Sequence, residues 1–357
     1  MKKEIGSEFW TGCSPQGKYG CEWPHIQGWS VKETLSGRVA LEYILERLVV
    51  EGKNSVYMPS YCCHTMIEPF LKQGMTVTFY DVVSTESGLE RMFDNNHGCE
   101  VVFLLDYFGI VDAETALIAR EQKAKGKCVI YDATHSIYSD FNYMNCDYVF
   151  GSYRKWLDVN CGFVAVRTES GIQFGSDWKH FDAYTDMRTR MFDLKSRYMN
   201  NEPVDKQQFL LWINEAEEML EQSYHHTLPD QRSLDVLKQT DYPYLVQSRR
   251  HNAKILIKGI SDMADKRVRC LVNKLGAHDT LLFVPIYVQG ELRNELRRFL
   301  IEHNIYCPVH WPLSELHTIN NAAKEVYQCE LSLLCDQRYD HFDMYRILET
   351  IKEYLKK

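Results

Sequence analysis

The chain has 357 residues, of which 45% are apolar and 25% are charged, so it has room for one large core and a smaller second one. Its net charge of −8 argues against a nucleic-acid-binding protein, because such proteins carry a basic stripe. The sequence has no apolar run long enough to span a bilayer and no apolar segment of the secretory type at its start. We therefore expect a cytoplasmic protein that neither crosses nor binds a membrane.

Short apolar runs alternate with helical patterns between residues 55 and 166. Strand, helix, strand at this spacing predicts βαβ units and a mostly parallel sheet. The predicted strands are 55–59, 75–81, 101–106, 127–132, 147–150 and 161–166, and the predicted helices among them are 65–73 and 112–125.

The pattern changes after residue 168, and residues 181 to about 239 are polar and helical. We expect the charged stretch 214–222 to be a solvent-facing helix surface. The remaining prediction is a long helix at 242–260, a strand at 281–288 and helices at 291–304 and 340–357. Together these patterns predict a large domain at 1–240, which includes an N-terminal arm, and a small α+β domain at 241–357.

Neither the cysteines nor the histidines are spaced as metal ligands. The 12 cysteines are scattered, with Cys62 and Cys63 adjacent, so we expect reduced thiols rather than disulfides or a zinc site. His225, His226 and His251 have no partner at ligand spacing and are interpreted as surface groups. No metal is therefore expected.

Ser36-Gly37-Arg38-Val39-Ala40 is followed by an amphipathic helical run from residue 41 to 49. Ser36 is a favourable N-cap, and Gly37 lets the backbone approach a ligand closely. The first N–H groups of a helix have no acceptor within the helix, so they form an anion site suited to a phosphate. Taken alone, a Ser-Gly pair before a helix is more often only a cap.

Asp132 ends a strand that is otherwise apolar. In parallel α/β sheets the functional residues lie at the carboxyl ends of strands. A carboxylate that faces a pyridinium nitrogen keeps this nitrogen protonated, which makes the ring an electron sink. For Asp132 alone, an acid that caps the following turn is an equally good interpretation.

Ser152 and Lys155 lie in a short segment between two predicted strands. The neighbouring Arg154 and the shelter of the sheet edge would lower the pKa of the Lys155 amine and favour the neutral form that attacks an aldehyde. Ser152 is placed to donate to a phosphate. An ordinary basic loop is the better interpretation of this segment alone, but its position after Ser36 and Asp132 reverses that preference.

Phosphate cradle, strand-end Asp and Lys, in this chain order, resemble the fold-type-I pyridoxal-phosphate (PLP) enzymes, most of all the DegT-like aminotransferases that make amino sugars on nucleotide carriers. SGRVALEYIL resembles that family's phosphate helix, and VYMPSYCCHTMIEPFLKQGMTVTFYDV resembles its following strand-helix-strand unit. IYDATHS, CPVHWPLSEL and LSLLCDQRYD resemble its Asp-Ala segment, its late His-containing loop and its closing helix. The resemblance implies an α/β fold-type-I aminotransferase: a mostly parallel seven-stranded sheet and a smaller C-terminal α+β domain.

The resemblance also implies roles for individual residues. Lys155 would be the catalytic residue and would hold PLP as a Schiff base. Asp132 would pair with the pyridine nitrogen, and His135 would lie near the phenolic oxygen. The phosphate would be bound by Ser36, Gly37, Arg38 and Ser152.

Two positions depart from the family pattern. Arg38 replaces a hydroxyl residue. Cys63 replaces the aromatic residue that stacks on the cofactor, and we expect Cys63 to contact the cofactor in its place. Tyr61 and His310 are the candidate substrate contacts.

The implied activity is transfer of an amino group from a donor such as glutamate to a keto acceptor, a keto sugar on a nucleotide, by a homodimer. Two alternatives remain open at this point. One is a PLP-dependent lyase or replacement enzyme, because the same lysine and Asp serve these reactions. The other is a non-catalytic PLP-binding or carbohydrate-binding protein that retains only the fold.

Overall fold

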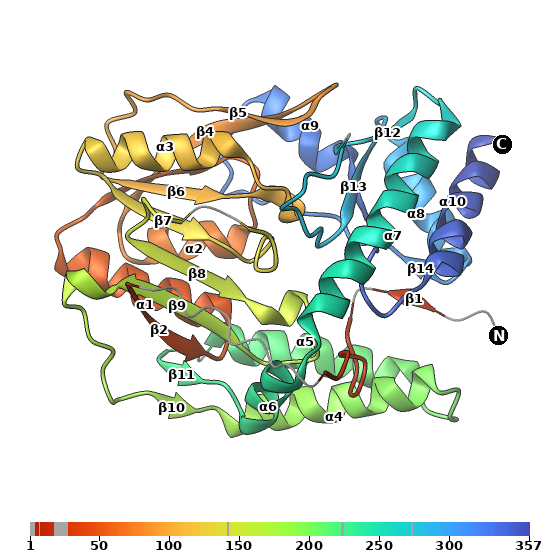
Figure 1. The fold of residues 1–357 in the computed structure, drawn as a ribbon, viewed down its shortest axis with the longest axis horizontal. Coiled ribbons are helices and arrows are strands. Elements are labelled where there is room, and N and C mark those ends of the chain that lie inside the picture. The colour runs from red at the N-terminus through yellow and green to blue at the C-terminus, as the bar shows by residue number, and fades with distance from the viewer. Residues whose placement is uncertain (1–3, 7, 18–27, 141–142, 223–224, 273) are drawn as a thin grey trace.

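An eight-stranded, mostly parallel sheet lies at the centre of the molecule (Figure 1). The computed structural model describes residues 4–6, 8–17, 28–140, 143–222, 225–272 and 274–357. The strand order is β2-β9-β8-β7-β6-β3-β4-β5, with β8, β7, β6, β3 and β4 parallel to one another. The strands are β2 (Trp29–Thr34), β3 (Ser55–Pro59), β4 (Thr76–Thr85), β5 (Gly88–Met92), β6 (Val101–Leu105), β7 (Cys128–Asp132), β8 (Tyr148–Ser152) and β9 (Gly162–Arg167).

Helices cover both faces of this sheet. The crossover from β3 to β4 and the crossover from β6 to β7 run in opposite directions along the sheet. Because such crossovers are right-handed, their helices lie on opposite faces, and the strand order reverses between β3 and β6. Ligands of α/β proteins bind at the carboxyl ends of strands near such a reversal. The helices are α1 (Gly37–Val50), α2 (His64–Lys72) and α3 (Ala113–Ala124).

The predicted α/β fold class is confirmed, but the sheet has eight strands rather than the expected seven. All six strands that periodicity predicts are present. Their observed bounds agree with the predicted ones within two residues, except that β4 extends further, to Thr85. Periodicity missed β2 and β5. The sequence of β5, GLERM, is an edge strand with charged residues, so it lacks the apolar run that marks a buried strand.

A second, three-stranded antiparallel sheet lies in the C-terminal part, in the order β12-β13-β15. The long helix α7 (Tyr242–Met263) begins where it was predicted, with the Asp241 side chain accepting from the Tyr244 N–H at 3.0 Å. The division into domains at residue 240 stays a prediction. The other elements here are β12 (Val268–Cys270), β13 (Val284–Val288), α8 (Leu292–Glu302), β14 (Ile305–Tyr306), α9 (Asn321–Cys329), β15 (Glu330–Leu333) and α10 (His341–Leu355).

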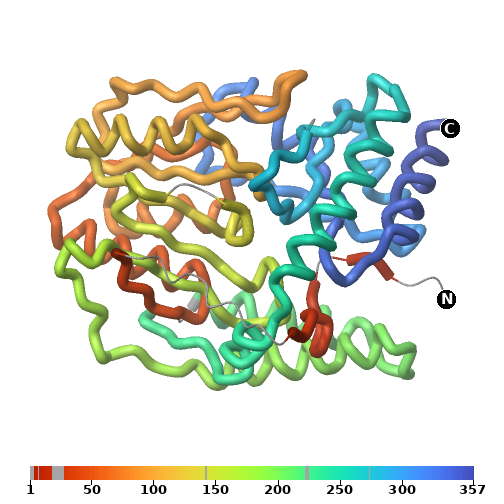
Figure 2. The backbone as a smooth tube through the Cα atoms, viewed as in Figure 1, coloured from red at the N-terminus to blue at the C-terminus, as the bar shows by residue number. Residues whose placement is uncertain are grey.

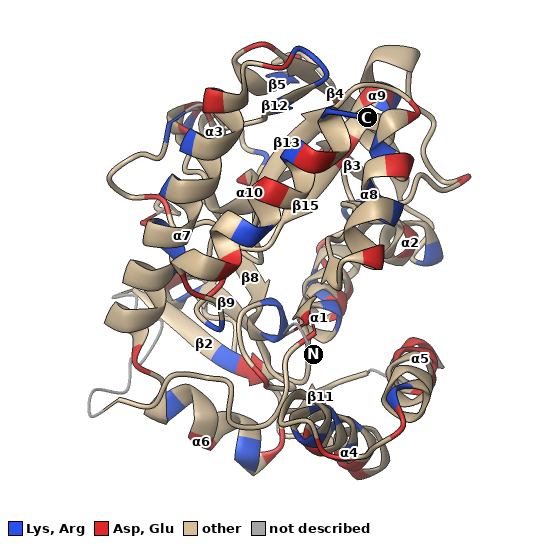
Figure 3. Ribbon diagram, turned by 90° about the vertical axis from the view of Figure 1, so that its right-hand side faces the viewer, with Lys and Arg blue, Asp and Glu red and all other residues tan. Residues whose placement is uncertain are grey.

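Between the two sheets in sequence, α4 (Asp182–Met199) and α5 (Lys206–Gln222) pack against each other and extend from the side of the molecule (Figure 3). Basic and acidic residues are interleaved along α4, whereas the charged residues of α5 after Lys206 are all acidic. Over the described residues, no helix combines the length and apolar character needed to cross a membrane. The remaining elements are β10 (Lys179–His180), β11 (Thr227–Leu228) and α6 (Gln231–Gln239).

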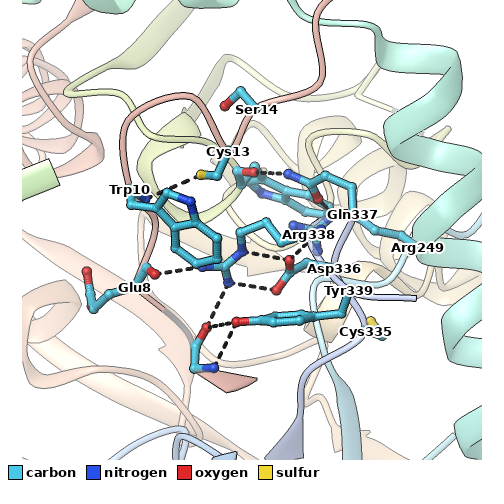
Figure 4. Close-up of polar contacts among 12 residues, drawn as sticks. Glu8, Trp10, Cys13, Ser14, Arg249, Cys335, Asp336, Gln337, Arg338 and Tyr339 are labelled. Atoms are coloured by element: carbon cyan, nitrogen blue, oxygen red, sulfur yellow. Dashed lines mark hydrogen bonds and ion pairs between the residues drawn. The ribbon is translucent and has the colours of Figure 1, made fainter. Parts of the chain in front are cut away.

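The described part of the N-terminal segment is fastened to the C-terminal part of the chain, as Figure 2 shows. Its strand β1 (Ile5–Gly6) pairs with β14, about 300 residues away. The buried Arg338 guanidinium secures this contact (Figure 4). It binds the Asp336 carboxylate through two nitrogens, at 2.7 and 2.8 Å, and donates to the carbonyls of Glu8 and Gly6 at 2.6 and 2.9 Å. It also stacks 4.0 Å from the centre of the Phe9 ring.

Arg338→Lys should therefore lower the free energy of unfolding by about 2 kcal/mol, because lysine keeps the charge but loses the forked geometry of these bonds. Chemical denaturation measures this difference. Arg120→Lys, on the exposed side of α3, is the matched control and should change stability by about 0.5 kcal/mol or less. Equal stability of the wild type and Arg338→Lys would show that the guanidinium bonds do not hold the segment.

Candidate active site

A cavity of about 360 Å³ lies at the carboxyl ends of β6, β7 and β8 and at the start of α1. Loops from separate regions of the chain form its wall. Eight of the residues singled out from the sequence line it: Ser36, Gly37, Arg38, Cys63, Asp132, His135, Ser152 and Lys155. The sheet therefore brings these eight residues together.

One end of the cavity is the start of α1. Ser36 caps this helix, with its Oγ accepting from the Val39 N–H at 3.3 Å. A Cβ atom on Gly37 would lie 3.2 Å from the Cβ of Ser152, and one on Gly162 would lie 2.5 Å from the Ser36 carbonyl carbon. Glycine at both positions allows the helix start to sit directly against β8 and β9. Ser36 and Ser152 thus line the cavity beside the N-terminus of this helix.

Asp132 lies at the carboxyl end of β7, where 7% of the residue remains exposed. One carboxylate oxygen accepts from the Thr134 N–H at 2.8 Å. Burial raises the pKa of Asp132 to about 6, although the Thr134 contacts lower it in part. A cation in the cavity would offset this penalty, so the site favours a positively charged ligand group near Asp132.

His135 is held as a neutral imidazole in one tautomer. Its Nδ1 accepts from the Phe108 N–H at 3.2 Å, so the proton is on Nε2. Burial, followed by the charge of Lys155, lowers the pKa of His135 to about 3. Phe108 has a φ of 57°, and the adjacent Gly109 packs so closely on the Thr280 carbonyl that a Cβ atom would lie 2.0 Å from its oxygen. This strained turn fixes the N–H that selects the tautomer.

Lys155 ends a 3-10 turn after β8 and is exposed to the interior of the cavity. Among the described residues, its amine has no hydrogen bond or ion pair. Burial by the surrounding protein, followed by the charge of Arg154, lowers the pKa of Lys155. Arg154 itself is paired with Glu217 of α5. The site therefore contains an uncommitted amine whose neutral form is more accessible than that of a lysine in water.

Helix α5 forms a wall of the cavity, contrary to the prediction for the stretch 214–222. Glu217, Leu220 and Glu221 line the cavity rather than facing only solvent. Burial alone would raise the pKa of Glu217, but the charges of Arg154 and other cations lower it to about 2. Glu221 lies 3.9 Å from the Arg38 guanidinium. Contacts with these two arginines turn this face of α5 towards the site.

No protein-family model and no curated protein sequence matches the chain. Solved structures do. Helicobacter pylori PseC, an aminotransferase involved in the biosynthesis of pseudoaminic acid, aligns with a TM-score of 0.62 at 15% identity, over 90% of this chain and 86% of its own. A DegT DnrJ EryC1 StrS aminotransferase from Brucella abortus aligns with a TM-score of 0.58 at 14% identity, over 92% and 86%. Bacillus subtilis NtdA, with the cofactor PMP bound, aligns with a TM-score of 0.62 at 13% identity, over 92% and 73%.

The chain has the fold of these aminotransferases. The resemblance to the DegT-like enzymes that the motifs indicate is thus confirmed at the level of the fold. At identities of 13 to 15%, the likeness shows the fold alone. The activity, the cofactor and the roles of the residues must be argued from the site itself.

On this aminotransferase fold, the structure does not bring Tyr61 and His310 to the cavity wall, where a substrate contact would lie. Both are buried, and the Tyr61 hydroxyl donates to the His310 carbonyl. The His310 N–H donates to Glu330 at 2.7 Å, and its Nδ1 lies 2.8 Å from the Ser332 Oγ. These contacts hold the chain immediately before Trp311.

Trp311, which the sequence analysis did not select, is the residue of this loop that lines the cavity. Its ring stacks on His135, with ring centres 5.3 Å apart and an angle of 26° between the planes. Adjacent positions in an irregular loop give no periodic signal of which side chain points inward. Only the fold distinguishes Trp311 from His310.

Proposed function

We propose that the chain is a PLP-dependent aminotransferase that transfers an amino group from an amino acid such as glutamate to a keto acceptor, a keto sugar carried on a nucleotide. The observation that carries this proposal is the convergence of Lys155, Asp132 and a phosphate-type cradle in one cavity. The bound PMP of the B. subtilis neighbour supports the cofactor, and a further neighbour, the sugar aminotransferase CalS13 from Micromonospora echinospora, supports the substrate class.

The residues of the cavity fit PLP. A volume of about 360 Å³ is within the range of small-molecule sites, which begins at about 300 Å³. The hydroxyls of Ser36 and Ser152 and the start of α1 suit the phosphate, and glycine at position 37 lets the helix start lie close to Ser152, because a Cβ atom there would lie 3.2 Å from the Ser152 Cβ. The buried Asp132, which also lines the cavity, suits a protonated ring nitrogen.

When bound, PLP supplies an aldehyde that takes up amino groups and a ring that withdraws electrons from the attached carbon. Lys155 would bind the aldehyde carbon and, once displaced by the amino donor, would carry the proton between carbon atoms as base and then as acid. Asp132 would hold the proton on the ring nitrogen. The Nε2–H of His135 would donate to the ring oxygen, since its Nδ1 already accepts from Phe108.

The amino-donor reaction tests this function. Glutamate added to the PLP-loaded protein should convert the bound cofactor to its amine form, with a change in the visible spectrum and release of 2-oxoglutarate. Release of a lyase or replacement product without the amine form would instead support the first alternative reaction. No spectral change with any amino donor would contradict transamination and favour a binding protein.

Gly37→Val is predicted to weaken PLP binding by about tenfold or more, because the added carbons push against Ser152 and displace a phosphate contact. Gly37→Ala, which adds a single carbon at 3.2 Å from Ser152, should have a smaller effect. Titration of the apo-protein with PLP measures both affinities, and thermal unfolding checks that the variants fold. Unchanged affinity in both variants would place the phosphate elsewhere.

We also propose that the protein acts as a cytoplasmic homodimer, on the basis of its resemblance to the DegT-like enzymes. Light scattering of the purified protein would measure its mass directly. A mass of one chain at working concentrations would contradict the dimer without affecting the assignment of Lys155.

A further inference from the structure

Carboxylate and imidazole groups gather where the middle of α1 meets the turn that follows α5. Glu42 and Glu46 are one turn apart on α1, so their side chains share a face. The Nδ1 of His225 lies 2.5 Å from a Glu42 oxygen, and the Nε2 of His226 lies 2.8 Å from a Glu46 oxygen. Both histidines were interpreted as surface groups because no partner lies at ligand spacing in the sequence. Their partners on α1 lie about 180 residues away along the chain.

Three of these side chains have the geometry of a metal site. One ligand atom from each of Glu42, Glu46 and His225 lies within 4.8 Å of the other two. A tetrahedral zinc ion, with bonds of about 2.0–2.2 Å, keeps its ligand atoms roughly 3.3–3.6 Å apart. Small rotations of the three side chains would therefore bring them into contact with one ion.

Glu42 provides an independent indication that a ligand is needed. The residue is 6% exposed, and its Oε2 has no hydrogen-bond partner within the described part of the chain. A buried carboxylate oxygen without a partner is unfavourable, and the like charge of Glu46 one turn away adds repulsion. A cation bound here would give the Glu42 oxygen a partner and would reduce the repulsion between Glu42 and Glu46.

The surroundings also resemble those of a metal site. The Nδ1 of His226 lies 3.0 Å from an Asp177 oxygen, and its ring stacks on Trp178 with centres 5.0 Å apart. These contacts orient His226 so that its Nε2 bonds to Glu46. Residues around metal sites often position a metal ligand through such a hydrogen bond. The His225 side chain is 73% exposed, which leaves a route for an ion from solvent.

We propose that Glu42, Glu46 and His225 bind a divalent metal ion of the zinc class, with water completing the coordination. Carboxylate and imidazole donors suit Zn²⁺ and its neighbours in the first transition row. The ion would fasten the segment at His225, which follows α5 in the chain, to α1. These two helices also carry Glu217 and Arg38 on the cavity wall. The proposal stands independently of the proposed function.

Calorimetric titration of the chelator-treated, full-length protein with Zn²⁺ at neutral pH tests the site. One ion should bind per chain, and both Glu42→Gln and His225→Ala should weaken binding by at least about tenfold. His251→Ala, which removes an exposed histidine of α7, is the matched control and should bind as the wild type does. Glu42→Gln is nearly isosteric, so thermal unfolding without metal should show a folded protein.

The proposal is overturned if the wild type binds no Zn²⁺, or if both ligand variants bind it with wild-type affinity. Co²⁺ provides a second readout, because the chain also has free cysteines. Weak visible bands that disappear in His225→Ala support the oxygen and nitrogen ligands. An intense near-ultraviolet charge-transfer band that both variants retain would assign the ion to thiolates and overturn the proposal.

Discussion

Lys155→Ala is expected to lower kcat/KM for transamination by about 10⁴-fold, because one amine serves both as the covalent anchor and as the proton carrier. Lys155 is the single lysine among the described residues that line the cavity, so no second primary amine there can replace it. Steady-state assay with glutamate and a range of keto sugars measures the loss.

The loss must come from chemistry rather than from unfolding. Burial and Arg154 lower the pKa of Lys155, so its charged form is less favourable in the folded protein than in the unfolded chain, and removing the side chain should not lower stability at neutral pH. Lys155→Arg keeps a positive charge but cannot carry the proton, and it should be as inactive as Lys155→Ala. Lys72→Ala, at an exposed site on α2, should retain full activity. Activity of Lys155→Ala within tenfold of wild type would exclude the proposed role.

Asp132→Asn should lower kcat by about 10²–10³-fold, since asparagine cannot hold a proton on the ring nitrogen by charge pairing. The same substitution should stabilise the apo-protein. Burial raises the pKa of Asp132 from 3.8 to about 6, so its contribution to stability is present below pH 3.8 and is lost as the pH rises through 6. At neutral pH, the ionised carboxylate costs up to about 3 kcal/mol, which asparagine avoids.

Denaturation of apo wild type and apo Asp132→Asn across this pH range measures the stability difference, which should disappear below pH 3.8. PLP should then raise the melting temperature of the wild type more than that of the variant, because the ring nitrogen pairs only with the carboxylate. Equal stability of the two apo-proteins at neutral pH, together with equal stabilisation by PLP, would contradict the assigned position of Asp132.

The proposed cofactor half of the site was predictable because its signals are local. Asp132 follows directly on an apolar strand, Ser36 lies where a helix begins, and Lys155 lies between two strands. Strand ends of a parallel sheet meet at one edge, so the order of these segments along the chain was sufficient to place them together. The cavity lining agrees with this inference.

The part of the cavity wall that α5 forms was not predictable from the sequence, because contacts between residues far apart in the chain position this helix. Glu217 belongs to a charged stretch that has no local reason to face inward, and it does so through Arg154, 63 residues earlier. The same holds for Glu42 and Glu46, whose histidine partners follow α5. In the late loop, Trp311 rather than His310 reaches the cavity, because buried contacts with Glu330 and Ser332 hold the histidine back.

Borohydride reduction of the PLP-loaded protein, followed by peptide mapping, tests the assignment of Lys155 most directly. Reduction converts the bond between the cofactor and its lysine into a stable secondary amine that mass spectrometry locates. The account predicts a pyridoxyl group on the peptide that contains Lys155, and no labelled peptide in Lys155→Ala. A pyridoxyl group on a different lysine, or no labelled peptide from the PLP-loaded wild type, would contradict it.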